Sequence, residues 1–152
     1  MRRLVEVGSI SMIVLATFAA TPRTAEGQGA YVPKQVDVAV DIRCLPGNGV
    51  SFSLVPWAAQ LAPGDSIAWI LSPDAGVPEI TITSKQAAWP FVAGPPYKGN
   101  AARPPKAKGM KSSVRAGEKY SYAVTAVCTR ADGTVSNVII DPDMIIIPGK
   151  TT

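Results

Sequence analysis

The side chains that could do chemistry in this chain are two cysteines and a few carboxylates, because the sequence contains no histidine. Histidine is the commonest general base near neutral pH and the commonest metal ligand. Its absence removes the base of a serine–histidine triad and the imidazole ligands of many transition-metal sites. Neither Gly-x-Ser-x-Gly nor Ser-x-x-Lys occurs, and glycine-rich phosphate-binding motifs are absent too. These common catalytic arrangements are therefore excluded.

Cys44 and Cys128 are the only cysteines of the chain. In an oxidising compartment an isolated pair most simply forms one disulfide. That bond would close a loop of about 84 residues, worth on the order of 4 kcal/mol in the chain-entropy model. A reactive or metal-binding thiol is the alternative, but no histidine or second nearby thiol favours it. We expect the disulfide.

The carboxylates that could act together are Asp141 and Asp143, on either side of Pro142, with Glu79 or Asp74. Two facing carboxylates can cleave a glycosidic bond, so a carboxylate-based hydrolase stays open as an alternative. Calcium needs six or more oxygens at close quarters, and no loop supplies a spaced acidic ladder. An Asp-Pro turn before the last strand is the simpler interpretation. We predict no catalytic residue, metal ligand or cofactor, and hence no enzyme.

The beginning of the chain has the features of an export signal. Arg2 and Arg3 form a positive n-region, and a mostly apolar run follows over 10–20. That run is too short to span a bilayer, which needs about 20 apolar residues. We predict a signal peptide over 1–27, with cleavage between residues 19 and 30. A retained N-terminal anchor is the alternative.

The remaining residues, 28–152, are long enough for one domain with its own core. They contain no second apolar span, so we expect a secreted or periplasmic protein without a membrane span. The formal net charge of the whole chain is +4, which is too small an excess to indicate nucleic-acid binding.

The elements that must position these side chains are strands. Apolar and polar residues alternate with a period of two, and turn signals such as Asp132-Gly133 separate the alternating segments. No convincing amphipathic helix is present. The pattern predicts an all-β sandwich of about seven strands, at 36–42, 50–54, 67–71, 80–83, 120–128, 135–140 and 144–147.

One long segment interrupts the alternation. Residues 84–117 contain five prolines, four glycines and seven basic side chains, and no acidic residue. Long loops in compact domains are usually functional or disordered. The aromatic side chains at 89–97 either dock a partner or fold back over one end of the sandwich. The basic ones either attract an anionic partner or keep a mobile loop solvated. The candidate partner-binding residues are Trp89, Phe91, Tyr97, Lys98, Arg103, Lys106, Lys108 and Lys111.

Two segments carry motifs in a recognisable order. Residues 61–70 read Leu-Ala-Pro-Gly-Asp-Ser-Ile-Ala-Trp-Ile, and residues 117–124 read Gly-Glu-Lys-Tyr-Ser-Tyr-Ala-Val. The first resembles the Gly-Asp-x-Val-x-Trp entry into a central strand of the cupredoxin superfamily, the fold of plastocyanin-like and azurin-like proteins. The second is similar to the Gly-x-Tyr-x-Tyr/Phe-x-Cys strand that leads to the copper loop of that family. The resemblance implies a Greek-key β-sandwich.

The same resemblance implies where copper ligands would stand, and the ligands are missing. Glu79 stands near the position of a ligand histidine, and Val124 near that of the cysteine ligand. The loop over 129–134 contains neither the second histidine nor the axial methionine. A blue-copper site needs two imidazoles and a thiolate. We therefore expect a copper-free member.

These observations favour a copper-free cupredoxin-like domain with a binding or structural role. We expect partner contact through the 85–115 loop. The partner itself is unknown from the sequence; a protein or an anionic envelope component fits the charge of the loop. An immunoglobulin-like or fibronectin-like adhesion module has the same strand content and remains the main alternative.

Overall fold

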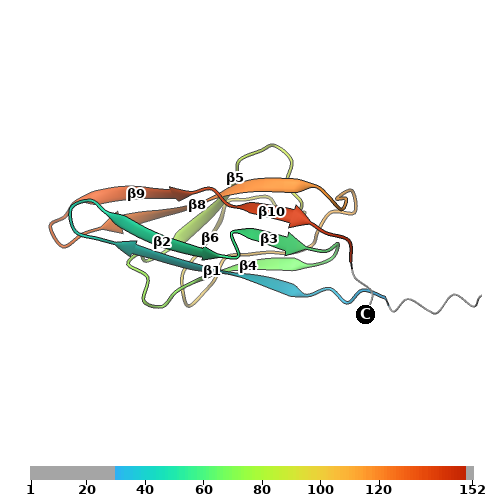
Figure 1. The fold of residues 1–152 in the computed structure, drawn as a ribbon, viewed down its shortest axis with the longest axis horizontal. Coiled ribbons are helices and arrows are strands. Elements are labelled where there is room, and N and C mark those ends of the chain that lie inside the picture. Colours follow the sequence, from blue (N-terminus) through green and yellow to red (C-terminus); the bar gives the residue numbers. More distant parts are fainter. Residues whose placement is uncertain (1–29, 150–152) are drawn as a thin grey trace, which may run out of the picture.

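In the computed structural model, residues 30–149 are described and form two packed β-sheets (Figure 1). The signal peptide predicted over 1–27 lies outside the described residues. Residues 30–149 contain no helix, and so no helix in this range that is long and apolar enough to cross a membrane. The strands are β1 (Gln35–Cys44), β2 (Val50–Val55), β3 (Ala58–Leu61), β4 (Ser66–Leu71), β5 (Ile80–Ser84), β6 (Tyr97–Gly99), β7 (Lys106–Ala107), β8 (Lys119–Thr129), β9 (Val135–Ile140) and β10 (Asp143–Ile146).

The smaller sheet has four strands in the order β2-β1-β4-β7. β1 is antiparallel to β2 and parallel to β4, and β7 is antiparallel to β4. Between β2 and β4, the chain leaves this sheet. It does so through β3, which belongs to the other sheet.

The larger sheet has six strands, in the order β3-β10-β8-β5-β6, with β9 also paired to β8. β3 is parallel to β10, whereas the other pairs are antiparallel. β9 and β10 lie end to end along the same edge of β8 and are separated by Asp141 and Pro142. Both sheets are therefore mixed.

The core fills the space between the two sheets with the inward half of each alternating strand. On β1 the inward positions Val38, Val40 and Ile42 are almost completely buried, as the period-two pattern requires. The largest fully buried side chains are Trp69 on β4 and Tyr122 on β8, whose rings meet edge to face at 5.5 Å between centroids. This contact joins the two sheets at the centre of the domain.

The all-β prediction is confirmed, but the number of strands was underestimated. The seven predicted strands are present, and β3, β6 and β7 are additional. β3 was missed because Pro56 separates it from β2, and a proline without an N–H group ends a strand ladder. β6 and β7 were missed because they are too short to show a periodic pattern.

In the Pro-Gly-Asp turn before β4, the aspartate is bonded to nearby backbone amides. Asp65 is fully buried, and the N–H groups of Ala62 and Lys34 donate to its carboxylate at 2.9 and 2.8 Å. The hydroxyl of Tyr31 also donates to it, and this hydrogen bond raises the pKa of Tyr31 to about 12. Asp65 thus fastens the segment before β1 to the sandwich.

The predicted disulfide between Cys44 and Cys128 is present and joins the end of β1 to the end of β8. No cysteine remains free. The bond therefore links the smaller sheet to the larger one at the end of the sandwich that carries the β8–β9 turn. Disulfides persist in oxidising compartments, which indicates an environment outside the cytoplasm.

We expect replacement of both cysteines by alanine to lower the free energy of unfolding by about 4 kcal/mol, because the disulfide closes a long loop. Equilibrium unfolding in denaturant measures the change. Wild-type protein unfolded with a reducing agent is the control and should lose a similar amount. An unchanged midpoint in both samples would contradict the prediction.

Candidate functional site

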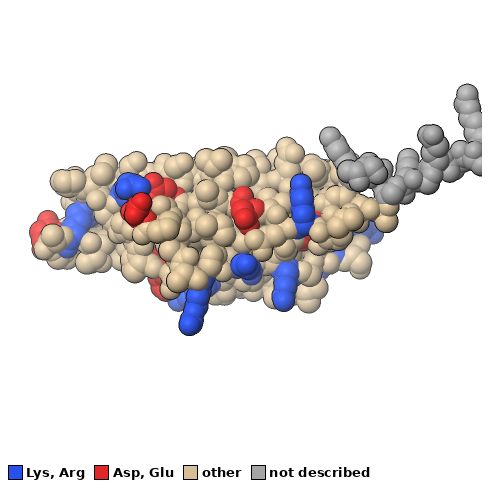
Figure 2. All heavy atoms as spheres, turned by 90° about the horizontal axis from the view of Figure 1, so that it is seen from below, with Lys and Arg blue, Asp and Glu red and all other residues tan. Residues whose placement is uncertain are grey.

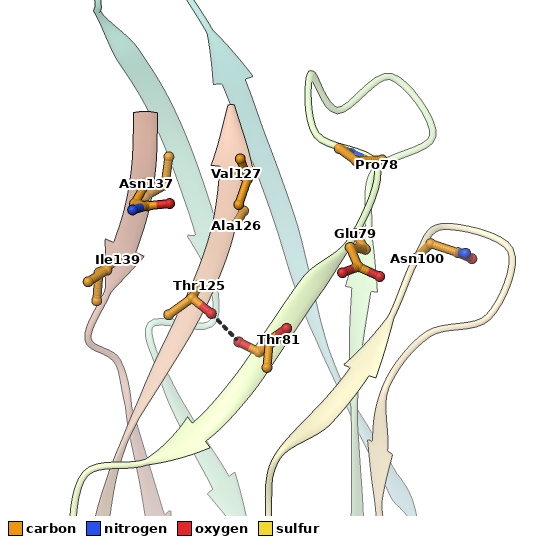
Figure 3. Close-up of a pocket in the computed structure, with 10 residues that line it drawn as sticks. Pro78, Glu79, Thr81, Asn100, Thr125, Ala126, Val127, Asn137 and Ile139 are labelled. Carbon is orange, nitrogen blue, oxygen red and sulfur yellow. Dashed lines mark hydrogen bonds between the residues drawn. The ribbon is translucent and has the colours of Figure 1, made fainter. Parts of the chain in front are cut away.

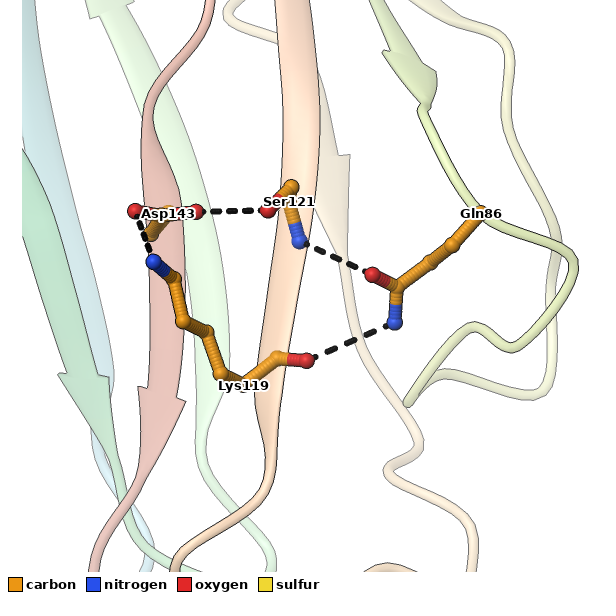
Figure 4. A network of polar contacts seen from close by, with 4 residues as sticks. All are labelled: Gln86, Lys119, Ser121 and Asp143. Carbon is orange, nitrogen blue, oxygen red and sulfur yellow. Dashed lines mark hydrogen bonds and ion pairs between the residues drawn. The ribbon is translucent and has the colours of Figure 1, made fainter.

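The segment 85–115 begins with a polar clamp on the edge of β8, where β5 ends. The side-chain amide of Gln86 donates to the carbonyl of Lys119 at 3.4 Å and accepts from the N–H of Ser121 at 3.3 Å (Figure 4). It therefore continues the pairing that β5 makes with β8. Asp143 on the other side of β8 accepts from Ser121 and from the Lys119 ammonium at 2.7 and 2.8 Å. The start of the segment is held on the sheet.

The aromatic residues of the segment are packed into the sandwich. Trp89 is 5 % exposed and Phe91 is fully buried, so neither side chain is displayed for direct contact with a partner. Of the two interpretations of this cluster, the structure has the one in which the aromatics fold back over the core. That Trp89 and Phe91 bind a partner stays a prediction, which their burial does not favour. The two rings pack there because large aromatic side chains cover apolar area of the core that would otherwise be exposed at this end of the sandwich.

Tyr97 links this cluster to the central tryptophan. Its ring stacks on Trp69 at 6.0 Å between centroids, and the indole N–H of Trp89 donates to its hydroxyl at 2.9 Å. The hydroxyl donates in turn to the carbonyl of Ala93. Partial burial raises the pKa of Tyr97, and the hydrogen bond from Trp89 offsets part of that effect. Tyr97 is half-buried, and its contacts with Trp69, Trp89 and Ala93 hold the segment against the core.

After Tyr97 the chain crosses from the larger sheet to the smaller one through a tight turn. The backbone N–H of Asn100 donates to the carbonyl of Arg103, and that of Arg103 donates back to Asn100. Gly99 is needed here, because a Cβ at this position would lie 2.3 Å from the Arg103 carbonyl oxygen and 2.6 Å from Pro105. β6 is the last strand of the larger sheet and β7 is the last strand of the smaller one. The turn that joins them therefore lies on one side of the sandwich.

The basic side chains of the segment remain displayed. They lie on β6, on the turn, on β7 and on the strand-like stretch that follows, and all are exposed: Lys98, Arg103, Lys106, Lys108 and Lys111. None of the ion pairs formed within residues 30–149 involves them. The one polar contact of Lys106 is with the amide oxygen of Gln35, at 3.3 Å. Figure 2 shows both basic and acidic side chains on the face seen there, so charge is mixed on that face.

A groove of about 620 Å³ lies on the outer face of the larger sheet. Figure 3 shows Asn137 and Ile139 on one side of it and Glu79 and Asn100 on the other. The hydroxyl of Thr125 donates to the carbonyl of Thr81 at its base, at 3.2 Å. The residues that line the groove are Pro78, Glu79, Thr81, Asn100, Thr125, Ala126, Val127, Asn137, Val138 and Ile139.

The two positions that the resemblance relates to copper ligands do not converge on one point. Val124 is fully buried between Ile82 and Ile140, its neighbours on either side in the sheet. Glu79 is exposed and points into the groove on the outer face (Figure 3). Within residues 30–149 no three histidine, cysteine or acidic side chains cluster closely enough to hold a metal ion.

Two of the carboxylates considered for acid–base chemistry, Asp141 and Asp143, form ion pairs with lysines. Asp141 pairs with Lys85 at 2.8 Å, and Asp143 pairs with Lys119. Partial burial raises the pKa of Asp143, but hydrogen bonds from Lys119 and Ser121 and the charges of Lys119 and Lys85 outweigh burial and leave it below its usual value. A general acid needs a raised pKa. Asp143 is therefore suited to structure and not to proton donation.

Sequence reasoning missed the groove and the Gln86 clamp. The groove had a readable signal, because Val127 and Ile139 are apolar at outward positions of strands whose inward positions are also apolar. The clamp had none, since a glutamine after a strand has no preferred partner. No protein-family model matches this chain, and no curated protein matches its sequence.

We expect Trp89→Ala to lower the free energy of unfolding by about 3–5 kcal/mol, because the cavity would open the end of the core. Trp57→Ala is the matched control, since Trp57 is 46 % exposed and should cost far less. Denaturant unfolding followed by circular dichroism measures both. Equal small losses would show that Trp89 does not anchor the segment.

Proposed function

We propose that this protein is a secreted or periplasmic, copper-free, cupredoxin-like domain that acts by binding an anionic partner and not by catalysis. The contact surface is the exposed basic side of the 85–115 segment. The observation that carries the proposal is the set of displayed basic side chains without acidic partners on a segment that the core holds in place.

The strand pairing supports a cupredoxin-like sandwich over the immunoglobulin-like alternative. Immunoglobulin-like sandwiches consist of two antiparallel sheets. Here each sheet contains one parallel pair, β1 with β4 and β3 with β10. Trp69 and Tyr122, which carry the resemblance in the sequence, are also the central pair of the core.

The side chains at the expected ligand positions support the copper-free part of the proposal. Val124 has no donor atom, and Glu79 offers one carboxylate on the opposite side of the sheet from it. Blue-copper sites need two imidazoles and a thiolate in one place. Electron transfer through copper is therefore no part of the proposed function.

The rigidity of the basic segment supports binding over simple solubility. Buried Trp89 and Phe91, the Gln86 clamp and the short strands β6 and β7 fix the backbone that carries the lysines. Charges held in place lose less conformational entropy on binding than charges on a mobile loop. Fixed basic groups also accelerate encounter with an anionic partner, in a manner that salt screens.

We expect the purified protein to bind no stoichiometric copper. Elemental analysis after incubation with Cu²⁺ and desalting measures metal content, and the visible spectrum should lack intense blue absorption. One copper per chain with a strong blue band would overturn the copper-free assignment.

We expect the protein to bind vesicles that contain phosphatidylglycerol more tightly than neutral phosphatidylcholine vesicles, with affinity falling as salt rises. Lys98→Gln/Lys108→Gln/Lys111→Gln should weaken binding by about a hundredfold, because each of the three charges near an anionic surface is worth ~1 kcal/mol and 1.4 kcal/mol is about a tenfold change in affinity. Co-sedimentation measures both effects.

The matched control is Lys34→Gln/Arg43→Gln/Lys119→Gln, which removes the same net charge elsewhere on the surface. Arg43 and Lys119 are exposed members of ion pairs, so their loss costs little stability. Equal weakening by the two variants would show that net charge, and not the 85–115 surface, drives binding. Binding to neither type of vesicle, with acidic poly-glutamate bound instead, would assign the surface to an acidic protein.

A further inference from the structure

The side of the sandwich opposite β6 and β7 presents a free strand edge without charge. β9 pairs with β8 alone among the strands of residues 30–149. Its sequence, Val-Ser-Asn-Val-Ile-Ile, contains no charged residue, glycine or proline. Native proteins normally protect an edge strand with lysine, proline, a bulge or a covering element. β9 has none of these protections in its own sequence.

The outward side chains of β9 are apolar as well as exposed. Val135 and Ile139 are 61 % and 65 % exposed, and Val127 beside them on β8 is 45 % exposed. Asn137 lies between Val135 and Ile139 on the same face, directly across from Val127. The edge and the outward face of β9 therefore carry no charged side chain of this strand.

β9 is held rigidly in place. The Arg130 guanidinium donates to the Ser136 hydroxyl at 2.9 Å and to the carbonyls of Leu45 and Gly49 at 2.9 and 3.1 Å. These bonds fasten the β8–β9 hairpin to the turn that joins β1 and β2. A rigid edge loses little entropy when a further strand is added to it.

We propose that two copies of this chain associate through their β9 edges, so that the two six-stranded sheets form one continuous sheet across a two-fold axis. Antiparallel pairing of a strand with its own copy places some residue opposite itself. With Asn137 opposite Asn137, Val135 of each copy faces Ile139 of the other. Cross-strand pairs of β-branched residues are among the favourable ones.

A second copy fits this surface better than the other candidate occupants. A self-paired interface must not repel itself, and an uncharged strand meets that condition. The described chain begins and ends at the far end of the sandwich from the β8–β9 turn (Figure 1), so neither end leads directly onto β9. The anionic partner proposed above belongs to the opposite, basic side. The dimer and the anionic partner therefore use different surfaces.

The first test is the mass of the full-length chain in solution, exported and purified with its disulfide intact. Sedimentation velocity across a concentration series should show a monomer–dimer equilibrium. Asn137→Lys should weaken the dimer by about tenfold or more, because it places two like charges directly opposite each other. Ser53→Lys, the same charge on the other uncharged edge strand β2, should leave the dimer unchanged.

The second test reads the register. Residues directly opposite across two strands have Cα atoms about 4.5–5.5 Å apart, within disulfide range. With oxidised glutathione as the oxidant, Asn137→Cys should form a covalent dimer rapidly. Val135→Cys and Ile139→Cys should cross-link when mixed and only slowly alone.

A monomer at every concentration would overturn the proposal. Loss of the dimer with Ser53→Lys but not with Asn137→Lys would overturn it too, because that result assigns the contact to β2. Cross-linking of Asn137→Cys no faster than that of Ser53→Cys would exclude the β9 pairing. None of these readouts depends on the anionic partner.

Discussion

The burial of Trp69 between the two sheets is the interaction on which the rest of this structure depends. Its ring meets Tyr122 of the larger sheet edge to face and Tyr97 of the 85–115 segment in a stack. Tyr97 in turn contacts Trp89, and Trp89 contacts Phe91. One indole therefore connects the smaller sheet, the larger sheet and the long segment that closes the core. Because aromatic side chains bury so much apolar area, this chain of contacts can order a segment rich in proline and lysine that has little pattern of its own.

The two sides of the sandwich differ because of how the chain crosses between the sheets. The crossing at Pro56 and Trp57 leaves the uncharged strands β2 and β9 as edges on one side. On the other side of the sandwich, the chain crosses between the sheets through Gly99 and the turn at Asn100. The exposed basic residues lie along this crossing. Val124, which the resemblance in the sequence places near a ligand position of the cupredoxins, is packed among other aliphatic side chains of the core.

Much of the fold could be predicted from the sequence, and less of the candidate site. Most of the strands were recognisable because their apolar and polar residues alternate and turn signals such as Asp132-Gly133 separate them. The disulfide followed from there being two cysteines. Two open alternatives were decided only by the tertiary structure: whether Trp89 and Phe91 are displayed or buried, and whether the segment around them packs on the sandwich. A sequence pattern shows which residues are apolar, but it does not show which part of the core those residues fill.

By itself the sequence determined the all-β class, the pairing of Cys44 with Cys128 and the absence of imidazole chemistry, because these depend on local periodicity and on which residue types exist. Only the tertiary structure decided that the sheets are mixed, that Gln86 continues the β5 ladder, and that Lys85 and Lys119 neutralise Asp141 and Asp143. It also decided that, within residues 30–149, β9 pairs with β8 alone. These features bring together residues distant in the chain, and such contacts arise from the packing of whole sheets and not from the preferences of any one segment.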